Sequence, residues 1–358
     1  MAVFYFLILV PILIQHSKIK GISINYERKN KLAMAFFFFF LTLLIILRHE
    51  KVGNDTIVYI DHFKRFSRTD WGNLWTSEGE YIFPYLNKLI SVFSKEPHFF
   101  LAVVAIIVTA MIWPTYRRLC EDTALTISLF CIMSTFVMMF SGIKQMLATG
   151  IGCIAYDFVR KRKLLPFFLA VLMAMSFHTS AFMLAFMYPL YYARITKKWL
   201  YVLVPVLAVC FVFNQQIFGA LALILQQYTS YETEIESTGA YTMLILFVLL
   251  TVFSFLIPDE KKLNEETVGL RNYLVLTMVL QMFAPLHTLA MRMSYYYMIF
   301  VPLLLPKIIK VRSKRWNQVA ILGRYVMVVF FLIYFFLIKV NDGGNLNVFP
   351  YHFFWESV

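Results

Sequence analysis

Apolar stretches that approach the length of a bilayer-spanning helix recur along the whole of this 358-residue chain. Such a helix needs about 20 mostly apolar residues. The stretches lie near residues 2–15, 32–47, 98–115, 123–140, 143–159, 164–177, 179–193, 199–213, 240–257, 270–286, 292–308 and 319–338. Because 60% of the residues are hydrophobic and only 15% are charged, the sequence predicts an all-α, polytopic integral membrane protein with about 12 transmembrane helices.

The remaining polar segments are too short to form a soluble domain, so residues 1–358 are expected to form a single membrane domain. The first apolar stretch lacks a basic segment before it and a small-residue cleavage site after it, which favours a retained helix over a signal peptide. The four cysteines lie in or beside apolar segments without the spacing of a metal site. We therefore expect buried thiols at Cys120, Cys131, Cys153 and Cys210.

Basic residues mark alternate connections between the apolar stretches. Of the 33 Lys and Arg residues, 22 fall in the segments 16–31, 116–122, 160–163, 194–198, 258–271 and 307–315. The positive-inside rule places these segments in the cytoplasm and both termini on the outer side of the membrane. The net charge of +13 is therefore a topology signal. It gives no reason to expect nucleic acid as a partner, because no basic cluster alternates with aromatic residues as a single-strand groove requires.

The largest connection, residues 48–97, is predicted to be an extracytoplasmic loop, and residues 339–358 an extracytoplasmic tail. The loop contains seven basic and seven acidic residues, so its charges balance. Within it, the stretch "YIFPYLNKLISVF" at 81–93 is apolar but short and contains Pro84, which indicates an amphipathic interfacial helix. Taken alone, the loop fits a solvated connector as well as it fits a functional element.

Further polar side chains are expected at the outer ends of the apolar segments, and a charge at membrane depth costs at least a few kcal/mol. Each has a structural alternative: a lysine that reaches the interface, a hydrogen-bonded core histidine, or an arginine that anchors a helix end. Their occurrence on one face, together with the loop and the tail "VFPYHFFW", indicates a functional site. The residues are Lys144 with Gln145 beside it, His178, and Arg292 with Tyr295 and Tyr296 at i+3 and i+4.

Six short motifs, in order from residue 48 to residue 355, resemble those of the EpsG-like, Wzy-type polymerases of O-antigen, capsule and exopolysaccharide. They are Arg48-x4-Gly53-x-Asp55-Thr56-x2-Tyr59-x3-Phe63, "EYIFPYLNKLI", "IKQMLATGI", "FHTSAF", "RMSYYY" and "FPYHFFW". One position departs from the family pattern: Lys144 stands where the family usually has arginine, and lysine lacks the two-pronged fork of a guanidinium.

The resemblance implies a glycosyltransferase that moves a growing glycan from a polyprenyl-diphosphate carrier onto a lipid-linked repeat unit at the outer face of the membrane. This reaction needs cations or hydrogen-bond donors for the diphosphate, a base for the acceptor hydroxyl, and polar or aromatic surface for sugars. The implied diphosphate ligands are Arg292, Lys144 and Arg48, with Gln145 as a further substrate contact. The candidate bases are Asp55, Glu80 and His178. The sugar path is assigned to Tyr59, Trp71, Trp75, Tyr295, Tyr296 and Tyr351.

The sequence shows no aspartate-rich metal motif in a suitable place, so we expect metal-independent transfer without a cofactor. Membrane lipid, a flippase and a chain-length regulator are the expected partners. Three alternative functions stay open. A flippase or exporter would carry charges at helix centres and an internal repeat. A membrane acyltransferase would take its acyl donor from the cytoplasmic side. A ligase-like transferase would use a similar outer-face site.

Overall fold

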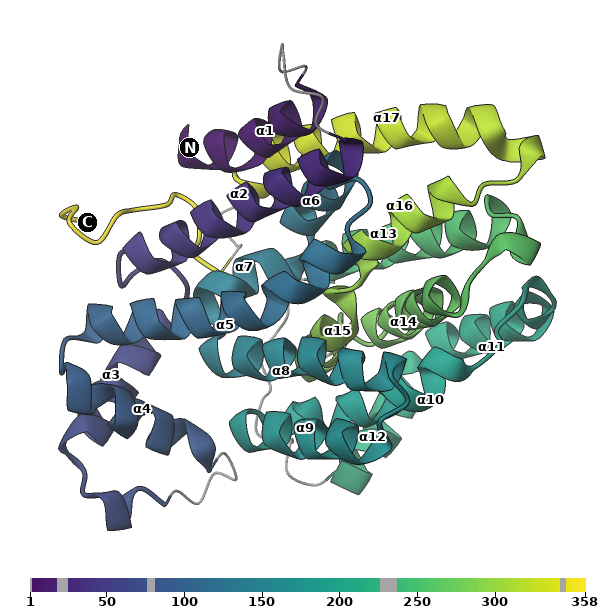
Figure 1. Ribbon diagram of the computed structural model, residues 1–358. Helices are drawn as coiled ribbons and strands as arrows, with labels where there is room; N and C mark the ends of the chain where they lie inside the picture. Colours follow the sequence, from purple (N-terminus) through teal and green to yellow (C-terminus); the bar gives the residue numbers. More distant parts are fainter. Residues whose placement is uncertain (1, 18–24, 76–80, 226–236, 287, 342–345) are drawn as a thin grey trace. The chain divides into compact units, whose positions relative to one another are not determined.

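The computed structural model describes residues 2–17, 25–75, 81–225, 237–286, 288–341 and 346–358. Over these residues the protein is helical, and β-type backbone pairing is limited to two isolated bridges, Arg48 with Phe353 and Pro258 with Arg312. The helices are labelled in Figure 1. The all-α prediction is therefore confirmed for the described part of the chain.

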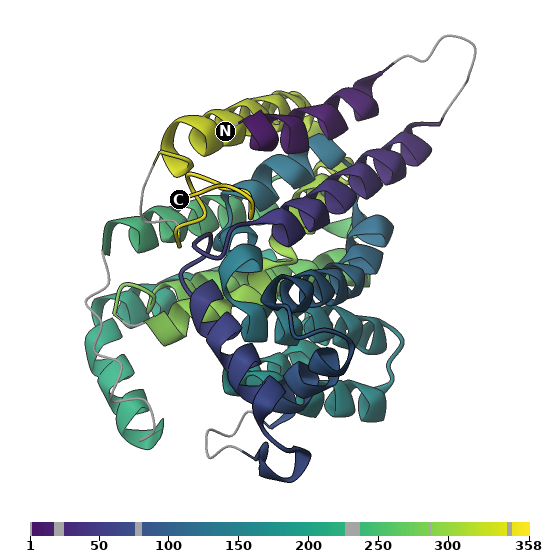
Figure 2. The ribbon, with the colours of Figure 1, turned by 90° about the vertical axis from the view of Figure 1, so that its left-hand side faces the viewer.

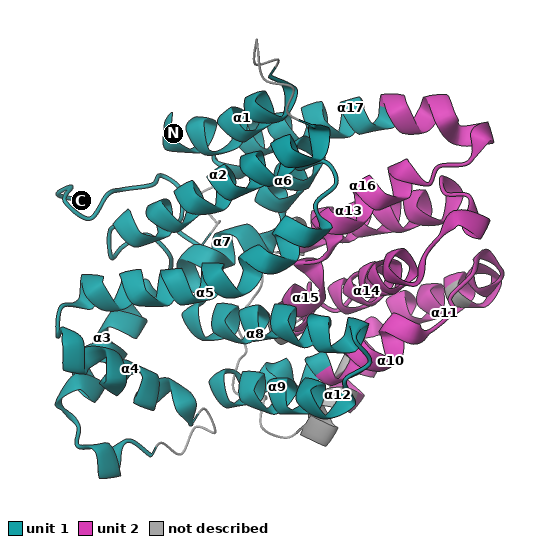
Figure 3. Ribbon diagram, in the orientation of Figure 1, with its two compact units in different colours: residues 1–184, 323–358 teal, residues 185–322 magenta. Residues whose placement is uncertain are grey.

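The chain divides into two compact units, residues 1–184 with 323–358, and residues 185–322 (Figure 3). The first unit contains α1 (Ala2–His16), α2 (Tyr26–Leu47), α3 (Thr56–Arg68), η1 (Trp71–Asn73), α4 (Ile82–Phe93), α5 (Pro97–Leu119), α6 (Thr123–Ile132), α7 (Ser134–Ser141), α8 (Ile143–Arg160), α9 (Leu164–Phe177) and the π-helical turn η6 (Tyr334–Lys339). The second unit contains α10 (Met187–Tyr192), η3 (Lys197–Trp199), α11 (Leu200–Val212), α12 (Asn214–Leu225), α13 (Ser237–Leu256), η4 (Glu260–Lys262), α14 (Glu265–Gln281), α15 (Thr288–Met298), α16 (Val301–Lys310) and η5 (Lys314–Trp316). In sequence, η2 (Thr179–Phe186) and α17 (Asn317–Ile333) run across the two boundaries.

Three helices in the described residues are long and apolar enough to cross a membrane: Tyr26–Leu47, Pro97–Leu119 and Lys314–Lys339. The number rises to five if two bent pairs each form one span. Other apolar helices are shorter. Helix α9, for example, has 14 residues and a length of about 21 Å, less than the roughly 30 Å of a hydrocarbon core. The protein is thus a membrane protein by its apolar helices, while the count of about 12 spans stays a prediction.

Helices also form where none was expected, and two predicted spans are each divided. The unexpected helices are α3 and α12. The predicted span 123–140 is broken into α6 and α7, which are bent by 66°, and the predicted span 292–308 is divided between α15 and α16. The interfacial segment 81–93 does form a helix, α4, and its buried side faces α3, α5 and α9.

Small residues on α8 allow the neighbouring elements of the first unit to approach closely. A Cβ atom at Gly150 would lie 2.7 Å from Met111 Cε of α5, and one at Gly152 would lie 2.9 Å from Leu184 Cδ2 of η2. Helix α8 also packs along α9, to which residues 161–163 connect it, so that the two helices are antiparallel. Close packing of this kind is typical of membrane helices, where small side chains replace hydrophobic burial as the source of contact.

A buried polar network ties α1, α2, α6 and α17 together. Asp122 caps α6 by accepting a hydrogen bond from Leu125 N at 3.3 Å, accepts a second from Gln15 Nε2 at 3.1 Å, and pairs with Arg324. Gln15 Oε1 accepts from Ala124 N at 2.7 Å. The side-by-side course of α1 and α2 is visible in both Figures 1 and 2. The network provides hydrogen-bond acceptors for the first backbone N–H groups of α6, which have no partner within the helix.

The second unit is built around α14, which packs against α10, α13, α15 and α16. Asn264 caps this helix by accepting from Thr267 N at 2.8 Å. The buried Arg271 donates to Glu260 Oε1 and to Ile195 O, each at 2.8 Å, so its charge is neutralised locally. A Cβ at Gly269 would lie 2.4 Å from the Tyr191 ring, which explains a glycine within the helix.

Candidate functional site

The start of the 48–97 loop is docked on the end of α7 through its backbone. Gly53 has a φ of +91°, and a Cβ atom there would lie 2.5 Å from Phe140 O, so both the conformation and the close approach require glycine. Thr56 Oγ1 donates to Val52 O at 2.7 Å and to Phe140 O at 3.3 Å. Asp55 N donates to Ser141 Oγ at 3.2 Å. These bonds fix residues 53–56 beside the junction between α7 and α8.

The C-terminal tail, residues 346–358, lies along the same part of the loop. Gly53 N donates to Asn347 O at 3.2 Å, and Asn54 N donates to Leu346 O at 2.9 Å. His49 N donates to His352 O at 2.8 Å, and Phe354 N donates to Leu47 O at 2.9 Å. The sequence motifs at the two ends of the chain are therefore in direct contact, as their predicted location on one face suggested.

Asp55 directly precedes α3, yet its carboxylate makes no capping hydrogen bond to that helix. Capping is the usual structural role of an aspartate beside glycine and threonine. The side chain is half-buried, and its backbone is held by Ser141. The backbone of Asp55 is therefore held in place, while its carboxylate does not cap the helix.

Lys144 lies in the first turn of α8, three residues after Ser141, and its ammonium group lies over an aromatic ring. Its Nζ is 5.2 Å from the centre of the Phe83 ring of α4, and Tyr59 of α3 packs edge-on against the same ring at 5.7 Å. Lys144 is half-buried, whereas Gln145 is buried. The positive end of a helix dipole and an ammonium group at the same place both favour an anion.

His178 is the C-terminal cap residue of α9. Because α9 runs antiparallel to α8, its C-terminal end lies toward the end of α8 that carries Lys144. The His178 backbone is engaged on both sides, since its N–H donates to Ala174 O at 3.0 Å and its carbonyl accepts from Ala181 N at 2.9 Å. Its imidazole is half-buried, so His178 stays a candidate base.

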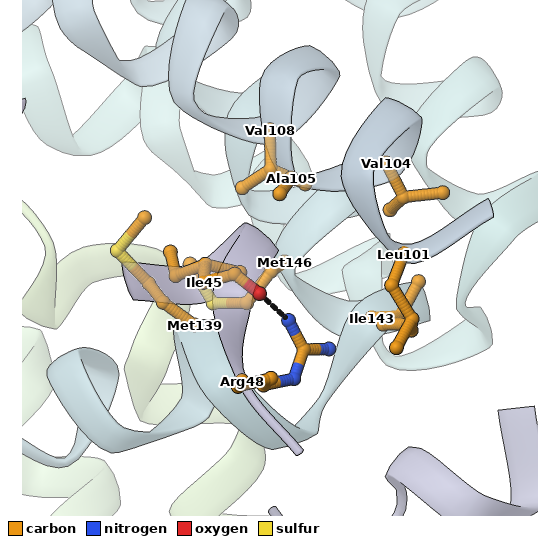
Figure 4. Close-up of a pocket in the computed structure, with 9 residues that line it drawn as sticks. All are labelled: Ile45, Arg48, Leu101, Val104, Ala105, Val108, Met139, Ile143 and Met146. Carbon is orange, nitrogen blue, oxygen red and sulfur yellow. Dashed lines mark hydrogen bonds between the residues drawn. The ribbon is translucent and has the colours of Figure 1, made fainter. Parts of the chain in front are cut away.

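Arg48 has a different environment from the one expected of a diphosphate ligand (Figure 4). The side chain is 1% exposed and lines a cavity of about 10 Å³ whose other walls are apolar residues of α2, α5, α7 and α8. Its Nη1 donates to Ile45 O at 2.5 Å, its Nε has no partner among the described residues, and burial lowers its pKa to about 10. The cavity is large enough for about one water. Arg48 therefore caps the C-terminus of α2 in a space that cannot hold a diphosphate.

Tyr351 is also part of the packing. It is buried, its hydroxyl donates to Leu44 O at 2.7 Å, and its ring lies edge-on against Phe4 and Phe140 at 5.8 and 6.4 Å. Burial raises the pKa of Tyr351 above its ordinary value. The residue holds the tail against the ends of α2 and α7, and its hydroxyl is already used.

Two tryptophans of the predicted sugar path are surface residues. Trp71 is exposed, and Trp75 is 69% exposed and stacks on Tyr81 with ring centres 4.5 Å apart. Such rings offer flat faces to a ligand or to the membrane interface. Glu80, the third candidate base, lies outside the described residues.

The second unit holds the remaining predicted site residues on α15. Arg292 is half-buried. Tyr295 and Tyr296 are each 1% exposed, in a helix that packs against α14 and α16. The tyrosine pair therefore belongs to the packed interior, and Arg292 is the most solvent-accessible of the three residues.

Sequence patterns did not single out Phe83, Ser141 or Lys339. Phe83 and Ser141 contact predicted site residues, and Lys339 contacts Ile132 O at 2.6 Å. Phe83 falls on the inward side of the amphipathic helix α4, a pattern from which its contact with the core could have been inferred. Ser141 and Lys339 offer no comparable signal, because their roles depend on a bend that the hydropathy pattern does not show.

The comparisons with known proteins agree with the motifs. The model of the EpsG family matches residues 31–353, which is most of the chain. The searches among curated proteins and among solved structures gave no match.

Proposed function

Because the chain belongs to the EpsG family, we propose that it is a Wzy-type polysaccharide polymerase, a membrane glycosyltransferase. It transfers a growing glycan from a polyprenyl-diphosphate carrier onto a lipid-linked repeat unit at the outer face of the bacterial inner membrane. The acceptor hydroxyl oxygen bonds to the anomeric carbon of the donor sugar, the bond from that carbon to the diphosphate oxygen breaks, and a base takes the hydroxyl proton.

The observation that carries this proposal is the docking of the loop start on the α7–α8 junction. It supports Asp55 as the base, because the backbone of this residue is fixed by Ser141 while its carboxylate does not cap α3. A general base must be positioned to reach the proton that it removes, and such catalysis contributes about 10²- to 10⁴-fold. His178 and Glu80 are the alternative bases.

Lys144 is the proposed cation for the diphosphate. Its location in the first turn of α8 combines an ammonium group with the amides of a helix N-terminus. This combination stabilises the charge that develops on the leaving diphosphate as the sugar–phosphate bond breaks. Arg292 on α15 is proposed as a further diphosphate ligand. Its guanidinium would donate hydrogen bonds to two diphosphate oxygens at once. Arg48 is left out of this role in the proposal, because it is buried and donates to Ile45 O.

Aromatic side chains are the proposed sugar contacts, chiefly Tyr59, Trp71 and Trp75, because the two tryptophans are exposed. The proposal includes metal-independent transfer and an orientation with both termini outside. A flippase that supplies repeat units and a regulator of chain length are proposed partners.

Deletion of the gene in its native host, followed by analysis of lipid-linked glycans, tests the proposal. We expect single repeat units to reach the outer face while polymer disappears, and a plasmid copy to restore polymer. Plasmids encoding Asp55→Asn and Asp61→Asn form a matched pair, because Asp61 is an exposed carboxylate of α3 itself. Accumulation of repeat units on the inner face would instead show a flippase.

A further inference from the structure

Helices α6 and α7 are separated by a break that leaves a carbonyl without its helical partner. The two helices bend by 66° at Met133, whose backbone is extended at φ −72° and ψ 148°. In a continuous helix, Ile132 O would accept from Phe136 N. Phe136 N instead donates to Met133 O at 3.1 Å. In apolar surroundings, a carbonyl released in this way must find another donor.

Lys339 supplies that donor. It is 7% exposed, and its Nζ donates to Ile132 O at 2.6 Å. The lysine is the last residue of the π-helical turn η6, which packs on α6. An ammonium group is stabilised at the C-terminal end of a helix such as α6 by the helix dipole. Because a buried ammonium is costly in a membrane protein, its location at the break indicates a specific role.

The described parts of the C-terminal segment, residues 334–341 and 346–358, contact α7 near its start and near its end. The Phe335 ring lies 5.8 Å from Phe136, near the start of α7. The Tyr351 ring lies 6.4 Å from Phe140, near its end. The tail also binds Gly53 and Asn54, and Gly53 lies close against Phe140 O.

Helix α7 in turn carries the candidate site. Its last residue, Ser141, holds the backbone of Asp55, and Lys144 follows three residues later in α8. Any change in the bend at Met133 would therefore move both groups, since α7 has only eight residues between the break and the site.

We propose that Lys339 is a positioning residue: it fixes the bend between α6 and α7 and thereby the placement of Asp55 and Lys144. The link to catalysis rests on the proposed function, whereas the effect on α7 does not. Lys339 touches neither substrate nor the reacting atoms in this account.

Hydrogen exchange of the purified full-length protein in lipid nanodiscs tests the proposal, with Lys339→Met removing the donor at similar length. We expect amides of residues 134–146 to exchange roughly tenfold faster or more, while α5 and α14 keep their wild-type rates. Lys339→Arg, which retains a cationic donor, should restore most of the protection. Lys95→Met is the matched control, because Lys95 is exposed in the loop, and it should change neither exchange nor polymer.

Unchanged exchange at residues 134–146 in Lys339→Met overturns the proposal, and so does a loss of protection spread evenly over the protein. If Lys339→Met does not accumulate, Lys339→Gln is measured in the same way, because its amide ends one bond short of the lysine Nζ and should not reach Ile132 O. Unchanged local exchange in that variant, or its failure to accumulate as well, also overturns the proposal. The exchange is measured without substrate, so an inactive wild-type protein would reject the proposed function and leave this inference standing.

Discussion

The C-terminal end of α2 and the N-terminal end of α8 each carry a basic residue from one of the six motifs, but the surroundings of the two residues differ. Arg48, at the end of α2, is buried in an apolar cavity with its Nη1 bonded to a helix carbonyl. Lys144, at the start of α8, is half-buried against the face of Phe83. One cation stabilises the negative end of a helix dipole, and the other adds to the positive end of one.

The comparison separates basic residues that maintain the fold from those suited to bind an anion. Lys339 belongs with Arg48, because it too is buried and donates to a carbonyl at the end of a helix. A cation at a helix C-terminus has its partner supplied by the protein. A cation at a helix N-terminus lies beside amides that also attract negative charge, so the two together suit an anion.

The largest effect is expected at Asp55, the proposed base. Asp55→Asn keeps the size of the side chain but removes the base, so polymer formation should fall by at least about 100-fold at unchanged protein level. Immunoblots and polymer gels of complemented deletion strains measure both quantities. Asp61→Asn on the exposed side of α3 should behave as wild type. Normal polymer in Asp55→Asn would return the residue to a structural role.

Arg292 extends the comparison to the second unit, where it is a half-buried cation like Lys144. Arg292→Ala should lower turnover by about 10²- to 10³-fold, since the lost contact acts on the charge that builds on the leaving diphosphate. Arg292→Lys keeps the charge without the fork and should fall between alanine and wild type. The measurement is the rate of chain elongation in membrane vesicles. Long polymer from Arg292→Ala at normal protein level would show that the arginine only anchors its helix.

Substitutions of Lys144 should change the elongation rate less, and the sign of the change should depend on the replacement. Lys144→Ala should lower elongation by roughly 10- to 100-fold, as expected for the loss of one charged contact to the diphosphate. Lys144→Arg should equal or exceed wild type, because the guanidinium offers two donors where the ammonium offers a point charge. The same vesicle assay ranks the three proteins. An arginine variant as inactive as the alanine variant would contradict a phosphate-binding role.

Substitution of Arg48 should have the smallest effect on turnover. This result would most clearly separate a basic residue that maintains the fold from one that binds the diphosphate. Arg48→Leu removes the cap of α2, so we expect a loss of stability of about 1–3 kcal/mol, part of which is offset because a buried charge is also removed. Elongation per folded protein should stay within about twofold of wild type if the cation has no part in the transition state. Thermal unfolding in detergent, followed by elongation assays normalised to folded protein, measures both. A strong loss of elongation at normal stability would place Arg48 in the active site.

The positions of the helices could be predicted from hydropathy to a considerable extent. The predicted segment 164–177 coincides with α9, and 143–159 differs from α8 by one residue. The bend at Met133 could not be predicted, because it contains neither proline nor glycine, and hydropathy reports burial without backbone direction. Helix α3 was missed because its mixed composition fits a connector, although Ile60, Phe63 and Ser67 fall on one buried face at helical spacing.

The candidate site could be predicted only in part from the sequence. Residues 53–56, which belong to the first motif, contact both the tail and the end of α7. Sequence spacing could not distinguish the buried Arg48 and Tyr351 from the half-buried Lys144 and Asp55. That distinction depends on which face of each helix meets its neighbours, and such contacts join residues far apart in the chain.

Reconstitution of the purified protein in liposomes, with a lipid-linked repeat unit as the sole substrate, tests polymerase activity most directly. The account predicts a ladder of longer lipid-linked glycans and release of one polyprenyl diphosphate for each glycosidic bond formed. Asp55→Asn should give no ladder, and Arg48→Leu should give a normal one per folded protein. Transfer of intact repeat units across the bilayer without any elongation by the wild-type protein would contradict the account.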